Sequence, residues 1–168
     1  MKKDDCDFGR MLGRALSIAA LDWKEKVRED GKPYLFHVMD SIEVCASRNA
    51  MLGCALYGRA QHYFLGKLSE EDEGFPTAVI EALAYIGKAG ASHAYPSPAF
   101  FYFIASGPAL AIEIVMADLM SHCDPKKMIR APGKSTIVMR SSTYRGMDIL
   151  DAELERRSVE DQKAEEKE

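Results

Sequence analysis

Apolar residues recur at intervals of three or four positions along most of this 168-residue chain. Leu110, Ile114, Asp118 and His122, for example, are each four residues apart, and residues at that spacing share one face of an α-helix. No stretch alternates apolar and polar residues with the period of two that marks a half-buried strand. The pattern therefore predicts an all-α domain of six or seven helices.

Glycine, proline and charged clusters divide this pattern into segments. We expect helices over about these residue ranges: 7–29, 37–47, 49–65, 76–87, 99–105, 108–122 and 136–156. The segments between them, above all "KAGASHAYPSP" (88–98) and "CDPKKMIRAPGKS" (123–135), have the composition of loops. We expect one domain over residues 1–156. The charged tail, 157–168, has no apolar stripe and is expected to be disordered.

Composition excludes several classes of function. The chain is 47% apolar and 29% charged with a net charge of −4, and without a basic block we expect no nucleic-acid binding. No segment approaches the ~20 apolar residues of a membrane span, and no apolar core of a signal peptide follows the N-terminus. The four cysteines are widely spaced, without a CxxC pair. We therefore expect a cytoplasmic protein with reduced thiols that serve mainly in packing.

Two polar residues stand out because of their apolar surroundings. Asp118 lies on the apolar face of its predicted helix, where an unpaired carboxylate would be costly. It needs an arginine, a helix cap, a histidine or a metal ion, and a hydrogen-bonded buried aspartate is the interpretation that the spacing favours. His37 begins a predicted helix after a Pro-Tyr turn, a position more typical of a structural contact than of a metal ligand.

The stretch "LGCALYGRAQHYF" (52–64) is unusual for a core helix. Its apolar residues are four apart, yet Tyr57, Gly58, Gln61 and His62 interrupt them. A glycine inside a helix costs up to about 1 kcal/mol relative to alanine. The polar insert therefore needs an explanation other than helix stability.

Several segments over residues 12–155 resemble the HD-domain phosphohydrolases of the RelA/SpoT type, including the small alarmone hydrolases. The opening "ALSIAALDWKEKVREDGKPYLFH" (15–37) is similar to the family's first motif, and "EGFPTAVIEALAYIGK" (73–88), "EIVMADLMSHCDP" (113–125) and "TYRGMDILDAEL" (143–154) are similar to later ones. These enzymes remove the 3′-pyrophosphate of (p)ppGpp with Mn²⁺. The resemblance implies a single HD-type helical bundle.

The same resemblance assigns family positions to the residues of this chain. The family's first metal-binding histidine falls on His37 and its late aspartate falls on Asp118. Its adjacent His-Asp pair falls on Tyr57 and Gly58. The acidic pair that activates water falls on Gln61 and His62, and the late asparagine falls on His122.

These substitutions weaken the family's chemistry. Gly58 offers no ligand, and Tyr57 is a poor one near neutral pH because a phenol has a pKa of about 10. Gln61 is not a base. The first loop reads Arg28-Glu29 where the family has Arg-Lys, so a negative charge replaces a cation expected near the substrate phosphates. The resemblance therefore implies a pseudo-enzyme without a metal cofactor.

Three functions remain open at this stage. The first is a regulatory pseudo-enzyme that binds a guanine nucleotide or another phosphorylated small molecule. Its substrate-binding candidates are these residues: Arg28, Lys32, Tyr34 and His122. The second is an active phosphohydrolase that uses Mn²⁺ or a rebuilt Zn²⁺ site, with His62 and His122 added to His37 and Asp118. The third is a protein that binds a partner or a second copy of itself through "YPSPAFFYF" (95–103), although core packing is the favoured role of that stretch.

Overall fold

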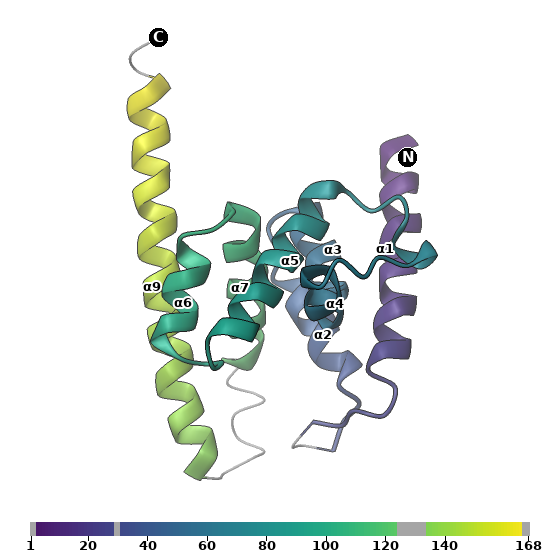
Figure 1. Cartoon of the computed structure of the whole chain (residues 1–168), viewed down its shortest axis with the longest axis horizontal. Coiled ribbons are helices and arrows are strands. Elements are labelled where there is room, and N and C mark those ends of the chain that lie inside the picture. The colour runs from purple at the N-terminus through teal and green to yellow at the C-terminus, as the bar shows by residue number, and fades with distance from the viewer. Residues whose placement is uncertain (1–2, 29–30, 124–133, 166–168) are drawn as a thin grey trace.

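The computed structural model describes residues 3–28, 31–123 and 134–165 (Figure 1). Within these ranges the chain is helical, and its only β-type pairing is an isolated bridge between Val27 and Pro33. The predicted all-α class is confirmed. No helix in the described ranges combines the length and the apolar character needed to cross a membrane.

Eight α-helices and two short 3-10 turns make up the described fold. The α-helices are α1 (Lys3–Asp22), α2 (Leu35–Glu43), α3 (Arg48–Ala55), α4 (Ala60–Phe64), α5 (Thr77–Ser92), α6 (Pro98–Ala105), α7 (Ala109–His122) and α9 (Lys134–Glu165). The turns are η1 (Tyr57–Arg59) and η2 (Glu70–Asp72). Serine side chains cap two of the helices, because Ser47 accepts from the Ala50 amide at the start of α3 and Ser97 accepts from the Phe100 amide at the start of α6.

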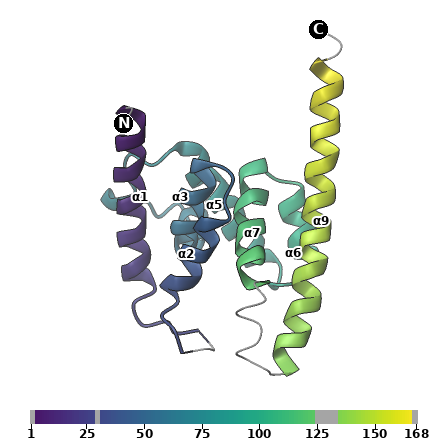
Figure 2. The same ribbon diagram turned by 180° about the vertical axis from the view of Figure 1, so that it is seen from behind.

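The helices α5 and α7 occupy the middle of the molecule. Helices α1 to α4 lie on one side of them and α6 and α9 on the other, as the two opposite views show (Figures 1 and 2). Gly53 allows α3 to approach α7 closely, because a Cβ atom at this position would lie 2.2 Å from Cδ1 of Ile114. Helix α3 thus packs against the middle of α7, and α2 contacts the C-terminal half of α7 through His37 and Ser41.

The aromatic stretch of residues 95–103 serves mainly in the core. Phe100 and Phe101 are almost completely buried, whereas Tyr102 is 60% exposed. The favoured interpretation of this stretch as packing therefore describes Phe100 and Phe101.

Several helix boundaries differ from the expectation, including those of α2, which spans Leu35–Glu43 where a helix over 37–47 was expected. The first helix ends at Asp22. The segments 26–28 and 31–34 that follow it are paired by the Val27–Pro33 bridge, with Gly31 at a φ of +81°. The predicted helix over 49–65 is interrupted at Leu56, where the chain enters η1. The segment 88–92, expected as loop, continues α5, since its small residues are compatible with a helix.

The C-terminal helix α9 also extends further than expected. It includes residues 157–165, which we expected to be disordered, and the loop expected over 124–133 lies outside the described residues. Arg157 explains part of the extension, because its guanidinium donates to the carbonyls of Ala105 and Gly107 at 2.7 and 2.9 Å. Glu153 and Arg156 add an exposed ion pair along the same helix.

A buried carboxylate fastens η2 to the rest of the domain. Asp72 accepts hydrogen bonds from the Tyr63 hydroxyl at 2.6 Å and from the Ser69 amide at 2.8 Å, and Arg59 lies 3.4 Å away. Burial opposes ionisation, but these donors outweigh it and hold the pKa of Asp72 below its usual value. Asp72 therefore contributes to stability as a carboxylate.

This arrangement predicts a pH-dependent loss of stability for Asp72→Asn. The folded-state pKa lies below the unfolded value of about 3.9, so the contribution is present above that pH and disappears as pH falls through the folded pKa. We expect the variant to lose about 1–3 kcal/mol near neutral pH and the difference to shrink in acid. Urea unfolding at several pH values measures it, with the exposed Asp151→Asn as the control; equal losses at all pH values would contradict the assignment.

Candidate functional site

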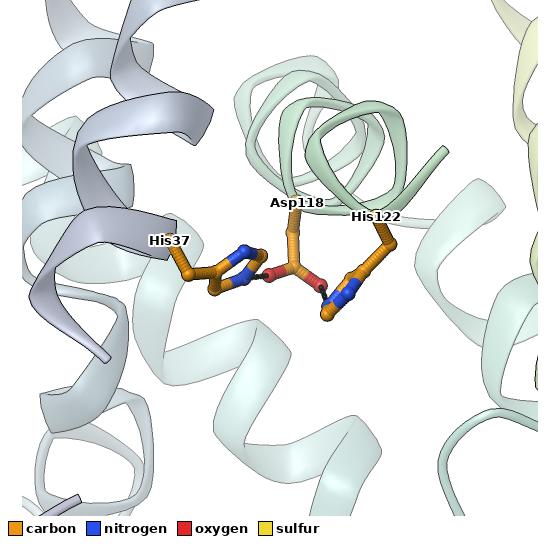
Figure 3. Close-up of side chains that lie close together, drawn as sticks. All are labelled: His37, Asp118 and His122. Carbon is orange, nitrogen blue, oxygen red and sulfur yellow. Dashed lines mark hydrogen bonds and ion pairs between the residues drawn. The ribbon is translucent and has the colours of Figure 1, made fainter. Parts of the chain in front are cut away.

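The candidate site forms where the start of α2 meets the end of α7. His37 lies in the first turn of α2, and Asp118 and His122 lie one turn apart in α7 (Figure 3). The imidazole rings of His37 and His122 lie on opposite sides of the Asp118 carboxylate in this view. The loop between α5 and α6 adds Tyr95, which precedes a cis proline. Residues 81 positions apart in the chain are thereby brought into direct contact.

Asp118 and His37 form a buried hydrogen-bonded pair. Nε2 of His37 lies 2.8 Å from Oδ1 of Asp118, and the two side chains are only 5% and 10% exposed. The Tyr95 hydroxyl donates to the other oxygen, Oδ2, at 3.0 Å. Burial disfavours the carboxylate, but the hydrogen bond and charge of His37, with the nearby His122 and Tyr95, outweigh burial and hold the pKa of Asp118 below its usual value. Asp118 is thus the hydrogen-bonded buried aspartate that its spacing favoured.

Two serines orient the His37 ring from its other side. Oγ of Ser121 lies 2.9 Å from Nδ1 of His37, and the Ser41 hydroxyl lies 3.1 Å from Oγ of Ser121. Ser121 is also 2.8 Å from the backbone carbonyl of Asp118. With both ring nitrogens in hydrogen-bonding distance of protein groups, the orientation of His37 is fixed without an external ligand.

His122 completes a group of three possible metal ligands. Its Nε2 lies 3.9 Å from Oδ2 of Asp118, its ring centroid lies 4.3 Å from that of His37, and its side chain is 33% exposed. One ligand atom from each of His37, Asp118 and His122 lies within 4.8 Å of the others. Three protein ligands with one open position are typical of catalytic Zn²⁺ sites. Binding would require the hydrogen bonds of Asp118 to His37 and Tyr95 to give way.

A small cavity adjoins this pair. Its volume is about 10 Å³, which is close to the space that one water molecule needs. Its lining is mostly aromatic and sulfur-bearing: Trp23, Tyr34, His37, Val38, Ser41, Cys54, Tyr57 and Asp118. A nucleotide does not fit inside this cavity.

Tyr57 and Tyr34 are held in their neutral forms. Burial, together with the nearby Asp118 carboxylate, raises the pKa of Tyr57 well above its usual value. Burial and Asp118 also raise the pKa of Tyr34 to about 12, while Arg28 acts in the opposite direction. A protonated phenol is a poor metal ligand, so Tyr57 does not replace the family's histidine.

Trp23 occupies the space beside Gly58. A Cβ atom built on Gly58 would lie 2.8 Å from Cζ2 and 3.1 Å from Nε1 of Trp23. The indole N–H is buried and has no hydrogen-bond partner among the described residues. A side chain at position 58 therefore requires the indole to move.

Sequence reasoning missed this role of Trp23. The tryptophan fell inside the helix predicted over residues 7–29, whereas it lies just after α1 and packs against η1. Two features of the sequence could have indicated this contact. The chain has a single large tryptophan, Trp23, and a glycine, Gly58, lies inside a predicted core helix where it leaves space for a large side chain.

The structure does not bring every candidate residue to the site. Gln61 and His62 are exposed on α4, and His62 is not in the three-residue ligand group. Arg28 lies in the loop after α1 and pairs with Asp40 of α2 at 3.3 Å. Lys32 is exposed in the same loop, where its carbonyl accepts from the Arg28 amide at 2.8 Å.

Tyr34 does reach the site. Its ring centroid lies 5.0 Å from that of His37 and 4.6 Å from that of Trp23. Nζ of Lys26 lies 4.3 Å from the Tyr34 ring centroid, which places a cation over the outer aromatic wall. The segment after α1 that carries Lys26, Arg28 and Lys32 thus borders the cavity through Tyr34.

The residues present do not fit the Mn²⁺ site that the resemblance implies. Of the four ligand positions, only His37 and Asp118 carry ligands, and these two bind each other. Trp23 fills the space beside Gly58, which has no ligand side chain. The chain matches no protein-family model, and a search of curated proteins found no significant match.

Proposed function

We propose that this protein is a catalytically degenerate relative of the HD-domain (p)ppGpp hydrolases that acts in regulation by binding a ligand. The resemblance over residues 12–155 and the all-α fold support the proposal. So does the contact of His37 with Asp118, because the resemblance required these two distant residues to meet. We thus propose that the helical scaffold is kept and that the hydrolytic activity is lost.

The packing of Trp23 against Gly58 is the observation that carries this proposal. In the resemblance, position 58 corresponds to the aspartate of the His-Asp pair. Here a Cβ atom would approach the indole to 2.8 Å, closer than packed atoms tolerate. The protein has filled the space of the missing carboxylate with an apolar ring, and a carboxylate cannot return there by itself.

The hydrogen bonds of the retained ligands support the same conclusion. A metal ion needs a lone pair on Nε2 of His37, which here donates its proton to the Asp118 carboxylate, and lone pairs on Asp118, which here accept hydrogen bonds from His37 and Tyr95. Removing hydrogen bonds from a buried carboxylate costs free energy that metal binding must first offset. Neither Tyr57, a neutral phenol, nor Gln61, an exposed amide, supplies a base for water.

The ligand-binding surface of this proposal is the loop of residues 26–34. The cavity has room for about one water molecule, so a nucleotide must bind outside it. Lys26, Arg28 and Lys32 lie on this loop, and Tyr34 offers an aromatic wall beside them. Cations next to an aromatic face suit a phosphorylated ligand with a base that stacks. A guanine nucleotide is the ligand that the resemblance favours.

Isothermal titration with ppGpp and GDP, followed by chromatography of the mixture after incubation with Mn²⁺, tests this proposal. We expect saturable binding without release of pyrophosphate. Lys32→Glu should weaken binding at least several-fold, whereas Lys67→Glu, an exposed charge reversal on another loop, should not. If the wild type releases pyrophosphate and Asp118→Asn does not, the protein is a hydrolase and the proposal that catalysis is lost is wrong. If neither ppGpp nor GDP binds, the proposed nucleotide ligand is wrong, and partner binding or self-association is left as the function.

One observation favours a second candidate function, a metal-dependent phosphohydrolase with a rebuilt site. The ligand atoms of His37, Asp118 and His122 lie within 4.8 Å of one another, and His122 is partly exposed. Imidazole and carboxylate ligands suit Zn²⁺. This candidate predicts that one metal ion per chain binds and that His122→Ala removes it.

A further inference from the structure

Two cysteine thiols meet between α2 and α3. Cys45 lies in the short connection between these helices, and Cys54 lies near the end of α3. Their Sγ atoms are 3.5 Å apart, and neither takes part in a disulfide. Sequence reasoning treated both thiols as packing residues, and nothing in the proposed function uses them.

The two thiols have unequal surroundings. Cys54 is 3% exposed and packs toward the backbone carbonyl of Ile114, 3.9 Å away. Cys45 is only partly buried, and its Sγ lies 3.2 Å from the carbonyl of Ser41. The hydrogen bond between the two thiols lowers the pKa of Cys45 and, together with burial, raises the pKa of Cys54. Cys45 is thus the more accessible and more readily ionised member of the pair.

We propose that Cys45 and Cys54 are an oxidation site, a dithiol that a hydroperoxide converts into an intramolecular disulfide. Redox-sensitive cysteines are characteristically accessible thiols that ionise readily and have a second thiol poised to resolve the first product. The contact of a partly buried Cys45 with a buried Cys54 fits this arrangement. The inference does not depend on the proposed function.

The reaction balances with hydrogen peroxide as the oxidant. The Cys45 thiolate attacks one peroxide oxygen, the O–O bond breaks, and the departing hydroxide takes up a proton to leave as water. Cys45 is then a sulfenic acid. The sulfur of Cys54 attacks the sulfur of Cys45, the S–O bond breaks, and a second water leaves with the Cys54 proton. Two thiols are oxidised by two electrons, and one peroxide is reduced to two waters.

A disulfide needs the two sulfurs to approach each other more closely than they do here. The sulfurs must move from 3.5 Å to about 2.05 Å. Cys45 lies outside both helices, between the end of α2 at Glu43 and the Ser47 cap of α3, so this adjustment breaks no regular helical turn. The bond would tie the connection that follows α2, the helix of His37, to the end of α3, which leads into η1.

Oxidation of Cys45 and Cys54 should be detectable in the fluorescence of Trp23. Cys54 lines the same cavity as Trp23, the single tryptophan of the chain. Drawing the Cys54 sulfur toward Cys45 alters the wall that faces the indole. We therefore expect a change in tryptophan emission on oxidation and its reversal on reduction.

The test uses the full-length chain with Cys6→Ser and Cys123→Ser, which removes the two other thiols. The protein is treated with hydrogen peroxide, unfolded and alkylated, and then analysed by mass spectrometry and peptide mapping. We expect both remaining thiols to resist alkylation together, a linked peptide pair that contains Cys45 and Cys54, and full recovery after dithiothreitol. Adding Cys45→Ser should leave Cys54 reduced. Adding Cys54→Ser should leave Cys45 as a sulfenic or higher acid.

Circular dichroism and the alternative variant Cys45→Ala keep the result interpretable if one variant folds poorly. Retention of two alkylatable thiols in the folded, peroxide-treated protein would overturn the proposal. Oxidation of Cys54 at an undiminished rate in a folded Cys45 variant would overturn it as well. A disulfide that forms only between chains would also contradict it.

Discussion

Replacing Asp118 with alanine is expected to lower the free energy of unfolding by about 1–3 kcal/mol, the usual cost of leaving a buried hydrogen-bonding group without its partner. The change leaves the buried His37 ring, and the Tyr95 hydroxyl, without their shared acceptor. Asp118→Asn, which keeps the shape and one acceptor oxygen, should lose less. Chemical denaturation of the variants measures these differences.

The exposed Asp151→Ala in α9 is the matched control for this prediction. It removes a carboxylate of the same type from a helix without touching a buried group, and its effect should lie within about 0.5 kcal/mol of zero. If Asp118→Ala unfolds at the same denaturant concentration as Asp151→Ala, the buried pair does not hold α2 against α7 and the description of the site is wrong.

Introducing by Gly58→Asp the carboxylate that the proposed relationship assigns to this position is expected to destabilise the protein and not to create a metal site. The new Cβ atom would lie 2.8 Å from the Trp23 ring, and overpacking of this kind costs about 1–3 kcal/mol before the buried charge is considered. Adding Trp23→Ala should make the second substitution less harmful, because the indole no longer occupies the space. The free energies of unfolding of the two single variants and the double variant form a double-mutant cycle.

Gly13→Asp provides the control for that cycle. Gly13 lies exposed in α1 with no atom within 4 Å of the Cβ position, so the same substitution meets no obstacle there. Additive effects of Trp23→Ala and Gly58→Asp would contradict the steric account, since independent sites show no coupling. The cycle therefore tests the packing that carries the proposed function.

The helical periodicity predicted the fold class and the internal geometry of α7. Asp118 and His122, four residues apart, do share one face of the helix, and Oδ2 of Asp118 lies 3.9 Å from Nε2 of His122. The spacing could not predict that His37 would be the partner of Asp118, because that contact depends on how α2 packs on α7. The resemblance supplied this pairing of positions.

Other features depend on contacts that periodicity does not contain. The packing of Trp23 on Gly58 requires the early end of α1 at Asp22 and the interruption at Leu56, and both boundaries were missed. The tail was expected to be disordered because it lacks an apolar stripe, but α9 continues to Glu165. Charged side chains explain it, because Glu153 lies one turn before Arg157, which also binds carbonyls of the α6–α7 connection.

The metal content of the protein is the most direct test of the central claim, that the site is held together by hydrogen bonds instead of a metal ion. The full-length chain is incubated with Mn²⁺ or Zn²⁺, dialysed, and analysed for bound metal beside His122→Ala and the exposed-histidine control His62→Ala. We expect no stoichiometric metal in any of the three proteins. About one ion per chain in the wild type and in His62→Ala, lost in His122→Ala, would contradict the claim and favour the rebuilt metal site.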